Sequence, residues 1–198
     1  MNATATDVKK LRGETGATFA DCKKALEESK NWDEAVKYLE ARRDKKAEKM
    51  ISANRETREG GVFSYVHHNH SIGVLLELNC STDFVARSES FRTLASELAL
   101  QIAGMAPKYV NYEDVPAEVI EAEKQKILED PSMARVAEDK RAVAVDGKLK
   151  KALATEVLLM QPWVKDDAIT VGDLVRKVIA ETGENIVLRR FSRFKLGE

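Results

Sequence analysis

Residues 72–87 read IGVLLELNCSTDFVAR, an apolar run that leads directly into a polar corner. Apolar residues over 72–79 predict a β-strand with Val74, Leu76 and Leu78 on one face. Residues 88–103 then carry apolar side chains at steps of three and four, which predicts an amphipathic helix. Asp83 and Phe84 therefore lie side by side at a strand-to-helix corner, where side chains project outward.

The chemistry of Asp83 and Phe84 leaves two interpretations open. In the first, Asp83 caps the following turn with Thr82 alongside it, and Phe84 folds back onto the sheet. In the second, both residues face a partner, because an acidic residue beside an exposed aromatic ring suits an interface better than a core. Composition and spacing alone do not decide between them.

Further strands complete a small sheet. Residues 62–67 predict a strand that forms a hairpin with 72–79, and Gly60-Gly61 is expected to end the helix before it. Residues 186–194 predict a last strand, in which Phe191 is out of phase with its apolar neighbours, so we expect a bulge or mixed exposure there. The resulting fold class is α+β, with a small antiparallel three-stranded sheet and packed helices.

The first fifty or so residues predict three short helices. Thr18 and Asn31 each precede an acidic residue by three positions, which is typical of a helix start. The charge-dense segment 42–58 predicts a solvated linker helix, since no aromatic residues are interleaved for nucleic-acid contact. We expect a three-helix bundle with the start of the linker helix in residues 1–53 and an α+β core in 54–198.

A projecting helical hairpin is predicted at about 117–158, from helical patterns over 117–128 and 133–158 that are joined near Pro131. Thr170 followed by Asp173 opens a further helix, and Gly183 suits its C-terminal cap.

Composition excludes several classes of protein. The 198 residues are 43% hydrophobic and 33% charged with a formal net charge of −1, which does not suit a general nucleic-acid binder. The first six residues show no secretory signal pattern, and no apolar run reaches the roughly 18 residues of a membrane span. With two cysteines, Cys22 and Cys80, a disulfide scaffold is not expected. These features predict a cytoplasmic protein without membrane contact.

The sequence offers no catalytic, metal or cofactor constellation. Asp146-Gly147-Lys148 lacks the other residues of a phosphate-binding loop, so direct nucleotide binding is not expected. His67, His68 and His70 lack a second ligand pair at site-like spacing. Cys80 falls on the apolar face of its strand, which hides a thiol from substrates. We therefore expect neither an enzyme nor a metalloprotein.

Three separated blocks resemble the elongation factor Ts family. Residues 79–87, NCSTDFVAR, resemble that family's core motif. Residues 8–12 with 15–17 and 21–26 are similar to its N-terminal signature, and residues 161–166, 170–174 and 183–186 to its C-terminal signature. The resemblance covers nearly the whole chain. It implies a ubiquitin-associated-like N-terminal bundle and guanine-nucleotide exchange on elongation factor Tu, in its GDP-bound and nucleotide-free states.

The resemblance also implies site residues. Arg12 and Lys23 match contact positions of the bundle, and Phe19 stands where the family often carries methionine. Asp83 and Phe84, flanked by Thr82 and Val85, match the pair that disturbs the partner's magnesium and phosphate site. Long family members carry two similar core halves and this chain has one, so the resemblance implies a homodimer that pairs through its sheets.

Two rivals belong to other classes. An adaptor would bind a small protein partner through the three-helix bundle and would not need Asp83 and Phe84. A nucleic-acid-binding translation factor would lose RNA affinity steeply with salt, and the balanced charge argues against it.

Overall fold

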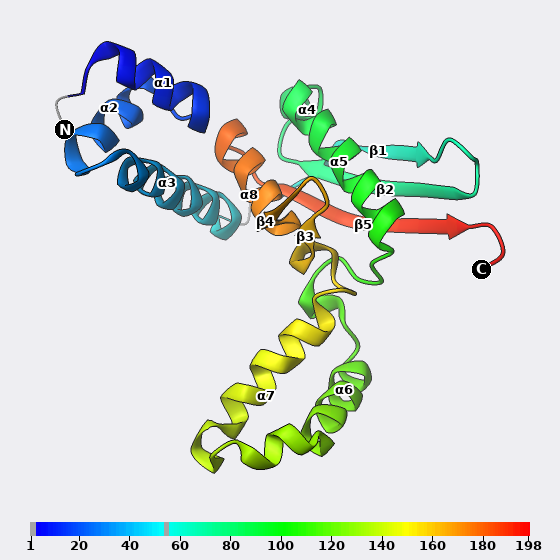
Figure 1. The fold of residues 1–198 in the computed structure, drawn as a ribbon. Coiled ribbons are helices and arrows are strands. Elements are labelled where there is room, and N and C mark those ends of the chain that lie inside the picture. Colours follow the sequence, from blue (N-terminus) through cyan, green and yellow to red (C-terminus); the bar gives the residue numbers. More distant parts are fainter. Residues whose placement is uncertain (1–2, 54–55) are drawn as a thin grey trace.

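A three-stranded antiparallel sheet lies at the centre of the molecule, which the computed structural model describes for residues 3–53 and 56–198 (Figure 1). The strand order is β1 (Glu59–Val66), β2 (Ile72–Cys80) and β5 (Ile186–Lys195). Because side chains alternate along a strand, Val74, Leu76, Leu78 and Cys80 of β2 are all buried on one face. The expected α+β class with a three-stranded antiparallel sheet is confirmed, and the structure places β2 at the centre of that sheet.

Strand β5 contains the expected bulge. Glu77 lies opposite Arg190, while the next residue of β2, Leu78, lies opposite Leu188. Arg189 is therefore an extra residue without a partner on β2, and the alternation of faces shifts by one at this point. This shift explains why Phe191 packs against the same core as Leu188.

Gly60 and Gly61 do not end a helix, as was expected, but lie inside β1. Gly60 has φ +139°, and a Cβ atom at this position would lie 2.2 Å from the carbonyl oxygen of Leu78. The glycine therefore allows close approach of two strands, because any side chain would collide with the neighbouring backbone. The prediction was wrong because a glycine pair is typical both of a helix end and of a strand that approaches its neighbour closely, and the local sequence does not distinguish the two.

Two helices cover one face of the sheet (Figure 1). Helix α5 (Glu89–Met105) begins after the N-cap Ser88 and buries Phe91, Leu94, Leu98 and Ile102, as its spacing predicts. Helix α8 (Val171–Thr182) begins with a capping box between Thr170 and Asp173 and ends at Gly183, whose φ is +74°. Both predicted caps of α8, Thr170 at its start and Gly183 at its end, are confirmed.

The N-terminal segment forms three helices with a separate core. They are α1 (Ala5–Thr15), α2 (Phe19–Glu28) and α3 (Trp32–Ser52). The Thr18 and Asn31 side chains accept hydrogen bonds from the backbone N–H groups three residues on, as expected. The apolar core of this bundle consists of Val8, Leu11, Cys22, Ala25, Leu26, Ala35 and Leu39.

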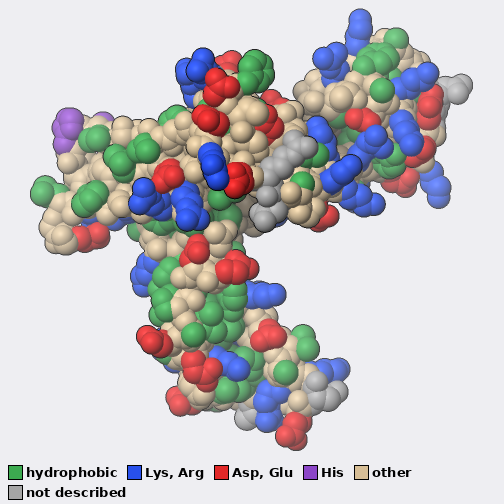
Figure 2. Space-filling view, turned by 180° about the vertical axis from the view of Figure 1, so that it is seen from behind, with side chains coloured by type: hydrophobic (Ala, Val, Ile, Leu, Met, Phe, Trp, Pro, Cys, Tyr) green, Lys and Arg blue, Asp and Glu red, His purple; other side chains and the backbone are tan. Residues whose placement is uncertain are grey.

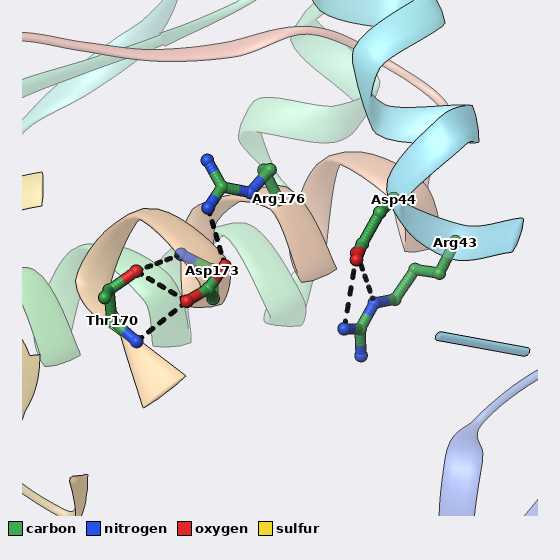
Figure 3. Close-up of polar contacts among 5 residues, drawn as sticks. All are labelled: Arg43, Asp44, Thr170, Asp173 and Arg176. Atoms are coloured by element: carbon green, nitrogen blue, oxygen red, sulfur yellow. Dashed lines mark hydrogen bonds and ion pairs between the residues drawn. The ribbon is translucent and has the colours of Figure 1, made fainter. Parts of the chain in front are cut away.

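Helix α3 is docked along its second half rather than solvated. Ala47 is fully buried in the core cluster of the sheet, and Lys46 donates a hydrogen bond from Nζ to the carbonyl oxygen of Ala180 on α8. Arg43 and Asp44 pair within α3, and the neighbouring helix α8 carries its own pair, in which Arg176 donates to Asp173 and Asp173 binds the N-cap Thr170 (Figure 3). The prediction of a solvated linker helix is therefore wrong for this half of α3. Ala47 is a small residue among many charged ones, so the sequence pattern did not show that it docks against the core. The division at residue 53 remains a proposal, since residues 54–55 lie outside those described.

The helical hairpin projects away from the sheet (Figures 1 and 2). It comprises α6 (Ala117–Glu129), the 3-10 turn η2 (Pro131–Arg135) and α7 (Glu138–Leu153). The second helix is shorter at both ends than the predicted 133–158. Its chain instead forms η2 before it, and η3 (Leu158–Met160) follows after a bridge between Val157 and Tyr109. The hairpin has its own apolar core, and a further 3-10 turn, η1 (Tyr112–Asp114), precedes it.

A short two-stranded ribbon was missed by the sequence reasoning. Strands β3 (Pro162–Trp163) and β4 (Asp166–Thr170) pair beside α5. Gln101 of α5 is fully buried and donates to the Gln161 side chain and to the Pro162 carbonyl oxygen, while its own oxygen accepts from the Val164 N–H. A two-residue strand leaves no periodic pattern, so this contact depends on the tertiary fold.

Candidate partner-binding site

The candidate site is the corner at residues 82–87, which connects β2 to α5. Its centre is the single-turn helix α4 (Asp83–Ala86), and Thr82 is the N-cap, with its hydroxyl oxygen accepting from the Val85 N–H at 3.4 Å. Thr82, rather than Asp83, therefore caps the turn. This leaves the Asp83 side chain free for other contacts.

Phe84 and Val85 point in opposite senses. Phe84 is 81% exposed, whereas Val85 is 4% exposed and belongs to the main core cluster. The interpretation in which Phe84 folds back onto the sheet does not describe this structure. Val85 holds the turn against the core, so its side chain is not accessible to a partner.

Asp83 makes one ion pair, with Arg87 at 3.1 Å. Both side chains are more than half exposed, at 65% and 76%, so solvent screens the pair and it contributes little to stability. Asp83 can therefore exchange Arg87 for a group on a partner at low cost. A carboxylate and an aromatic ring are thus presented together on one exposed turn.

Glu184 is a residue of the corner that the sequence did not reveal. Its Oε2 accepts from the Thr82 N–H at 3.0 Å and its Oε1 accepts from the Thr82 hydroxyl at 2.8 Å. Beneath it, burial raises the pKa of the Cys80 thiol, and the nearby Glu184 charge adds to that rise. The two partners are separated by 102 residues, so no local pattern could have found the contact.

A second candidate surface lies on the N-terminal bundle. Phe19 and Lys23 are four residues apart on α2 and share one face; both are exposed, Phe19 to 46%. Arg12 is exposed in the last turn of α1. Burial raises the pKa of the Cys22 thiol, and the Arg12 charge opposes part of that rise. The sequence-predicted residues thus form two groups, one on the bundle and one at the corner.

The face of the sheet turned away from α5 is open and partly apolar (Figure 2). Val62, Val66 and Phe194 are at least 60% exposed, and Leu75 is 50% exposed. On the same face Arg190 binds Glu77 at 2.7 Å, and this hydrogen bond lowers the pKa of the Glu77 carboxyl. We call this surface, centred on Leu75, the open sheet face.

The histidines at positions 67, 68 and 70 lie in the turn that joins β1 to β2. His67 Nδ1 lies 2.7 Å from the Tyr65 hydroxyl, and the rings of His67 and His68 contact each other at a tilt of 57°, with centroids 4.2 Å apart. Over residues 3–53 and 56–198, no group of three or more His, Cys, Asp or Glu side chains could hold a metal ion. In the same residues, no helix is both long and apolar enough to cross a membrane.

Comparisons with known proteins agree with this architecture. A family model described as "Elongation factor TS" matches residues 5–198. An elongation factor Ts of Methylacidiphilum infernorum is 50% identical over 192 residues, which cover 96% of this chain and 94% of that protein. One of Coprothermobacter proteolyticus is 48% identical over 202 residues, covering both chains fully, and one of Thermotoga maritima is 47% identical over 196 residues, covering 96% and 94%.

The family model and these relatives define the class of protein as a translation factor. The chain belongs to the elongation factor Ts family. The expected family resemblance is thereby confirmed, together with a role in protein biosynthesis. At the level of the family, this role is guanine-nucleotide exchange on elongation factor Tu.

Proposed function

We propose that this chain promotes GDP release from elongation factor Tu by inserting Phe84 beside the partner's magnesium and phosphate site. The observation that carries the proposal is the exposure of Phe84, 81%, on a turn whose next residue is fixed in the core. An aromatic ring held out from a fixed backbone loses little conformational entropy when a partner covers it. Phe84 is therefore suited to act as a wedge.

Asp83 supplies the charge in this mechanism. Its carboxylate leaves Arg87, 3.1 Å away, and disturbs the polar network that supports the partner's Mg²⁺. Loss of Mg²⁺ coordination and of phosphate hydrogen bonds then loosens GDP. The bundle, through Arg12, Phe19 and Lys23, holds the GTPase domain while the corner acts.

Exchange of this kind needs no chemistry on the exchange factor itself. If the protein weakens GDP binding by some factor, GDP must weaken binding of the protein by the same factor. Incoming nucleotide therefore displaces the protein, and the cycle can repeat. The proposal accordingly assigns no catalytic residue, metal or cofactor to this chain and no nucleotide site of its own.

The open sheet face is proposed as a homodimer interface. Four exposed apolar side chains of 50% exposure or more lie on its strands β1, β2 and β5, namely Val62, Val66, Leu75 and Phe194. Sheets pack face to face about 10 Å apart when both faces are apolar. Cys22 and Cys80 are both buried and free, so a disulfide is not part of the proposed dimer.

The test is release of a fluorescent GDP from purified elongation factor Tu, with this protein and with a variant that carries both Asp83→Ala and Phe84→Ala. We expect the wild type to accelerate release and the double variant to lose most of that acceleration. If the wild type does not accelerate release, the exchange function is wrong, and an adaptor that binds a small protein partner through the three-helix bundle becomes the better hypothesis. If the double variant retains full activity, the exchange function stands, and the contact that drives it lies elsewhere, for example on the three-helix bundle.

A further inference from the structure

The turn that presents Asp83 and Phe84 is too short to hold itself in place. Helix α4 has four residues, and one isolated helical turn is unstable because nucleation fixes several dihedral angles for one hydrogen bond. Its exposed residues add little, since the ion pair of Asp83 with Arg87 is open to solvent and Phe84 is 81% exposed. The orientation of the corner must therefore come from its two ends.

The C-terminal end is fixed by burial and the N-terminal end by hydrogen bonds. Val85 packs in the core, and every polar atom of Thr82 has a partner. The Thr82 carbonyl oxygen accepts from Cys80 Sγ at 3.2 Å and from the Ala86 N–H, while its hydroxyl oxygen accepts from the Val85 N–H. The two remaining donors, the N–H and the hydroxyl of Thr82, both bind the Glu184 carboxylate.

Glu184 is itself held by the end of α8. It follows Gly183, whose left-handed conformation closes the helix, and its own N–H donates to the Thr182 hydroxyl oxygen at 3.4 Å. The next residue, Asn185, is buried and leads directly into β5. A carboxylate that accepts two hydrogen bonds makes a stronger contact than a neutral acceptor.

We propose that Glu184 is a positioning residue for nucleotide exchange, which clamps Thr82 and so holds Asp83 and Phe84 in the orientation that the partner binds. This inference rests on the proposed function. Without the clamp, the corner samples other conformations, and only a fraction of the molecules is ready to bind. Apparent affinity falls by that fraction, whereas the rate of GDP release from the complex, once formed, is unchanged.

The proposal is tested with Glu184→Ala, Glu184→Gln and the matched control Glu181→Ala, an exposed acidic residue in the last turn of α8, three positions before Glu184. Glutamine keeps an acceptor for the Thr82 N–H and can donate to its hydroxyl oxygen, so it should restore much of the clamp. Three quantities are measured: amide hydrogen exchange at Thr82 and Val85 in the free protein, GDP release over a range of protein concentrations, and thermal unfolding.

For Glu184→Ala we expect amide exchange at Thr82 and Val85 to be about tenfold faster, because hydrogen bonds to a charged group are lost. The half-saturating concentration for GDP release should rise about fivefold, with the maximal rate retained. Glu184→Gln should lie between Glu184→Ala and the wild type, and Glu181→Ala should match the wild type. The unfolding temperature should hardly change, since the contact is at the surface.

Several results would overturn the proposal. Unchanged amide exchange in Glu184→Ala would mean that Glu184 does not hold the corner. Faster exchange with an unchanged half-saturating concentration would mean that the order of the corner does not matter for binding. A lower maximal rate together with a lower unfolding temperature would assign Glu184 a general structural role. If the wild-type protein does not accelerate GDP release from elongation factor Tu, the proposed function fails. The amide exchange rates of the free protein then decide alone whether Glu184 holds the corner.

Discussion

Replacing Phe84 by alanine should separate binding from stability. Phe84 is 81% exposed in the free protein, so folding gains little from its ring. We expect Phe84→Ala to change the free energy of unfolding by no more than about 0.5 kcal/mol, as for other surface substitutions. Its effect should instead appear when a partner covers the ring.

The size of that effect follows from the exposed fraction. Full burial of a phenylalanine side chain contributes about 1.5–3 kcal/mol, and with 81% of the residue still exposed, about 1.2–2.4 kcal/mol is left for the partner to gain. Since 1.4 kcal/mol corresponds to a factor of ten, Phe84→Ala should weaken binding to nucleotide-free elongation factor Tu by about 7- to 50-fold.

The assay combines titration calorimetry against nucleotide-free elongation factor Tu with urea unfolding of the free protein. Phe91→Ala is a matched control, because Phe91 lies in the first turn of the next helix, α5, is of the same residue type and has no exposed surface. Phe91→Ala should cost about 3–5 kcal/mol of stability, as large-to-small core substitutions do.

Two outcomes would refute this reasoning. If Phe84→Ala lowered the free energy of unfolding by more than about 1 kcal/mol, the ring would be packed in solution, since surface substitutions lie within about half of that. If stability and affinity both stayed at the wild-type values, Phe84 would be an exposed residue without a role in binding, and the wedge mechanism would be wrong.

Three further predictions concern the scaffold. Gly60→Ala should lower the free energy of unfolding in urea by at least about 2 kcal/mol, because its Cβ atom would lie 2.2 Å from a carbonyl oxygen. Gly147→Ala should raise it by about 0.5–1 kcal/mol, because Gly147 lies in α7 with no atom within 4 Å of the added Cβ. Equal effects of the two substitutions would contradict this geometry. Burial alone would raise the pKa of Asp173, but hydrogen bonds from Thr170 and Arg176 hold it below its usual range, so its contribution is present at neutral pH and is lost as the pH falls through the lowered folded value. Asp173→Asn should therefore cost about 0.5–1 kcal/mol at neutral pH and progressively less in acid, and a pH-independent cost would refute this assignment. Leu75→Lys should convert a sheet-paired homodimer into a monomer in sedimentation equilibrium without loss of helical signal, and an unchanged mass would exclude the open sheet face as the interface.

Local patterns predicted most of the elements. The strand at β2, the helix at α5 and the caps at Thr18, Asn31, Thr170 and Gly183 follow from side-chain period and from short-range hydrogen bonds, which the sequence displays directly. The bulge in β5 was predictable for the same reason, because it changes the phase of an apolar pattern.

Contacts between distant segments were not predictable. Helix α3 docks through Ala47, which is fully buried among charged residues, with Met50 beside it and a hydrogen bond from Lys46 to α8. The β3–β4 ribbon is held by the buried Gln101. Gly60 fits either a helix end or a close contact between strands, and only its neighbour across the sheet decides between the two. In the candidate site, Asp83 and Phe84 could be found from the sequence, but Glu184 could not, since nothing near residue 184 indicates a partner at residue 82.

Helix α8 relates the two candidate contact surfaces to each other. Its side contacts α3, which continues without interruption into the bundle that carries Phe19. Its end places Glu184 against Thr82, which carries the Asp83–Phe84 corner. A partner that contacts both surfaces therefore meets groups whose spacing is set before binding, so ordering costs are small for the second contact. In the proposed mechanism, both contacts then act on one GTPase at the same time, and the bundle holds the partner while the corner disturbs its magnesium site.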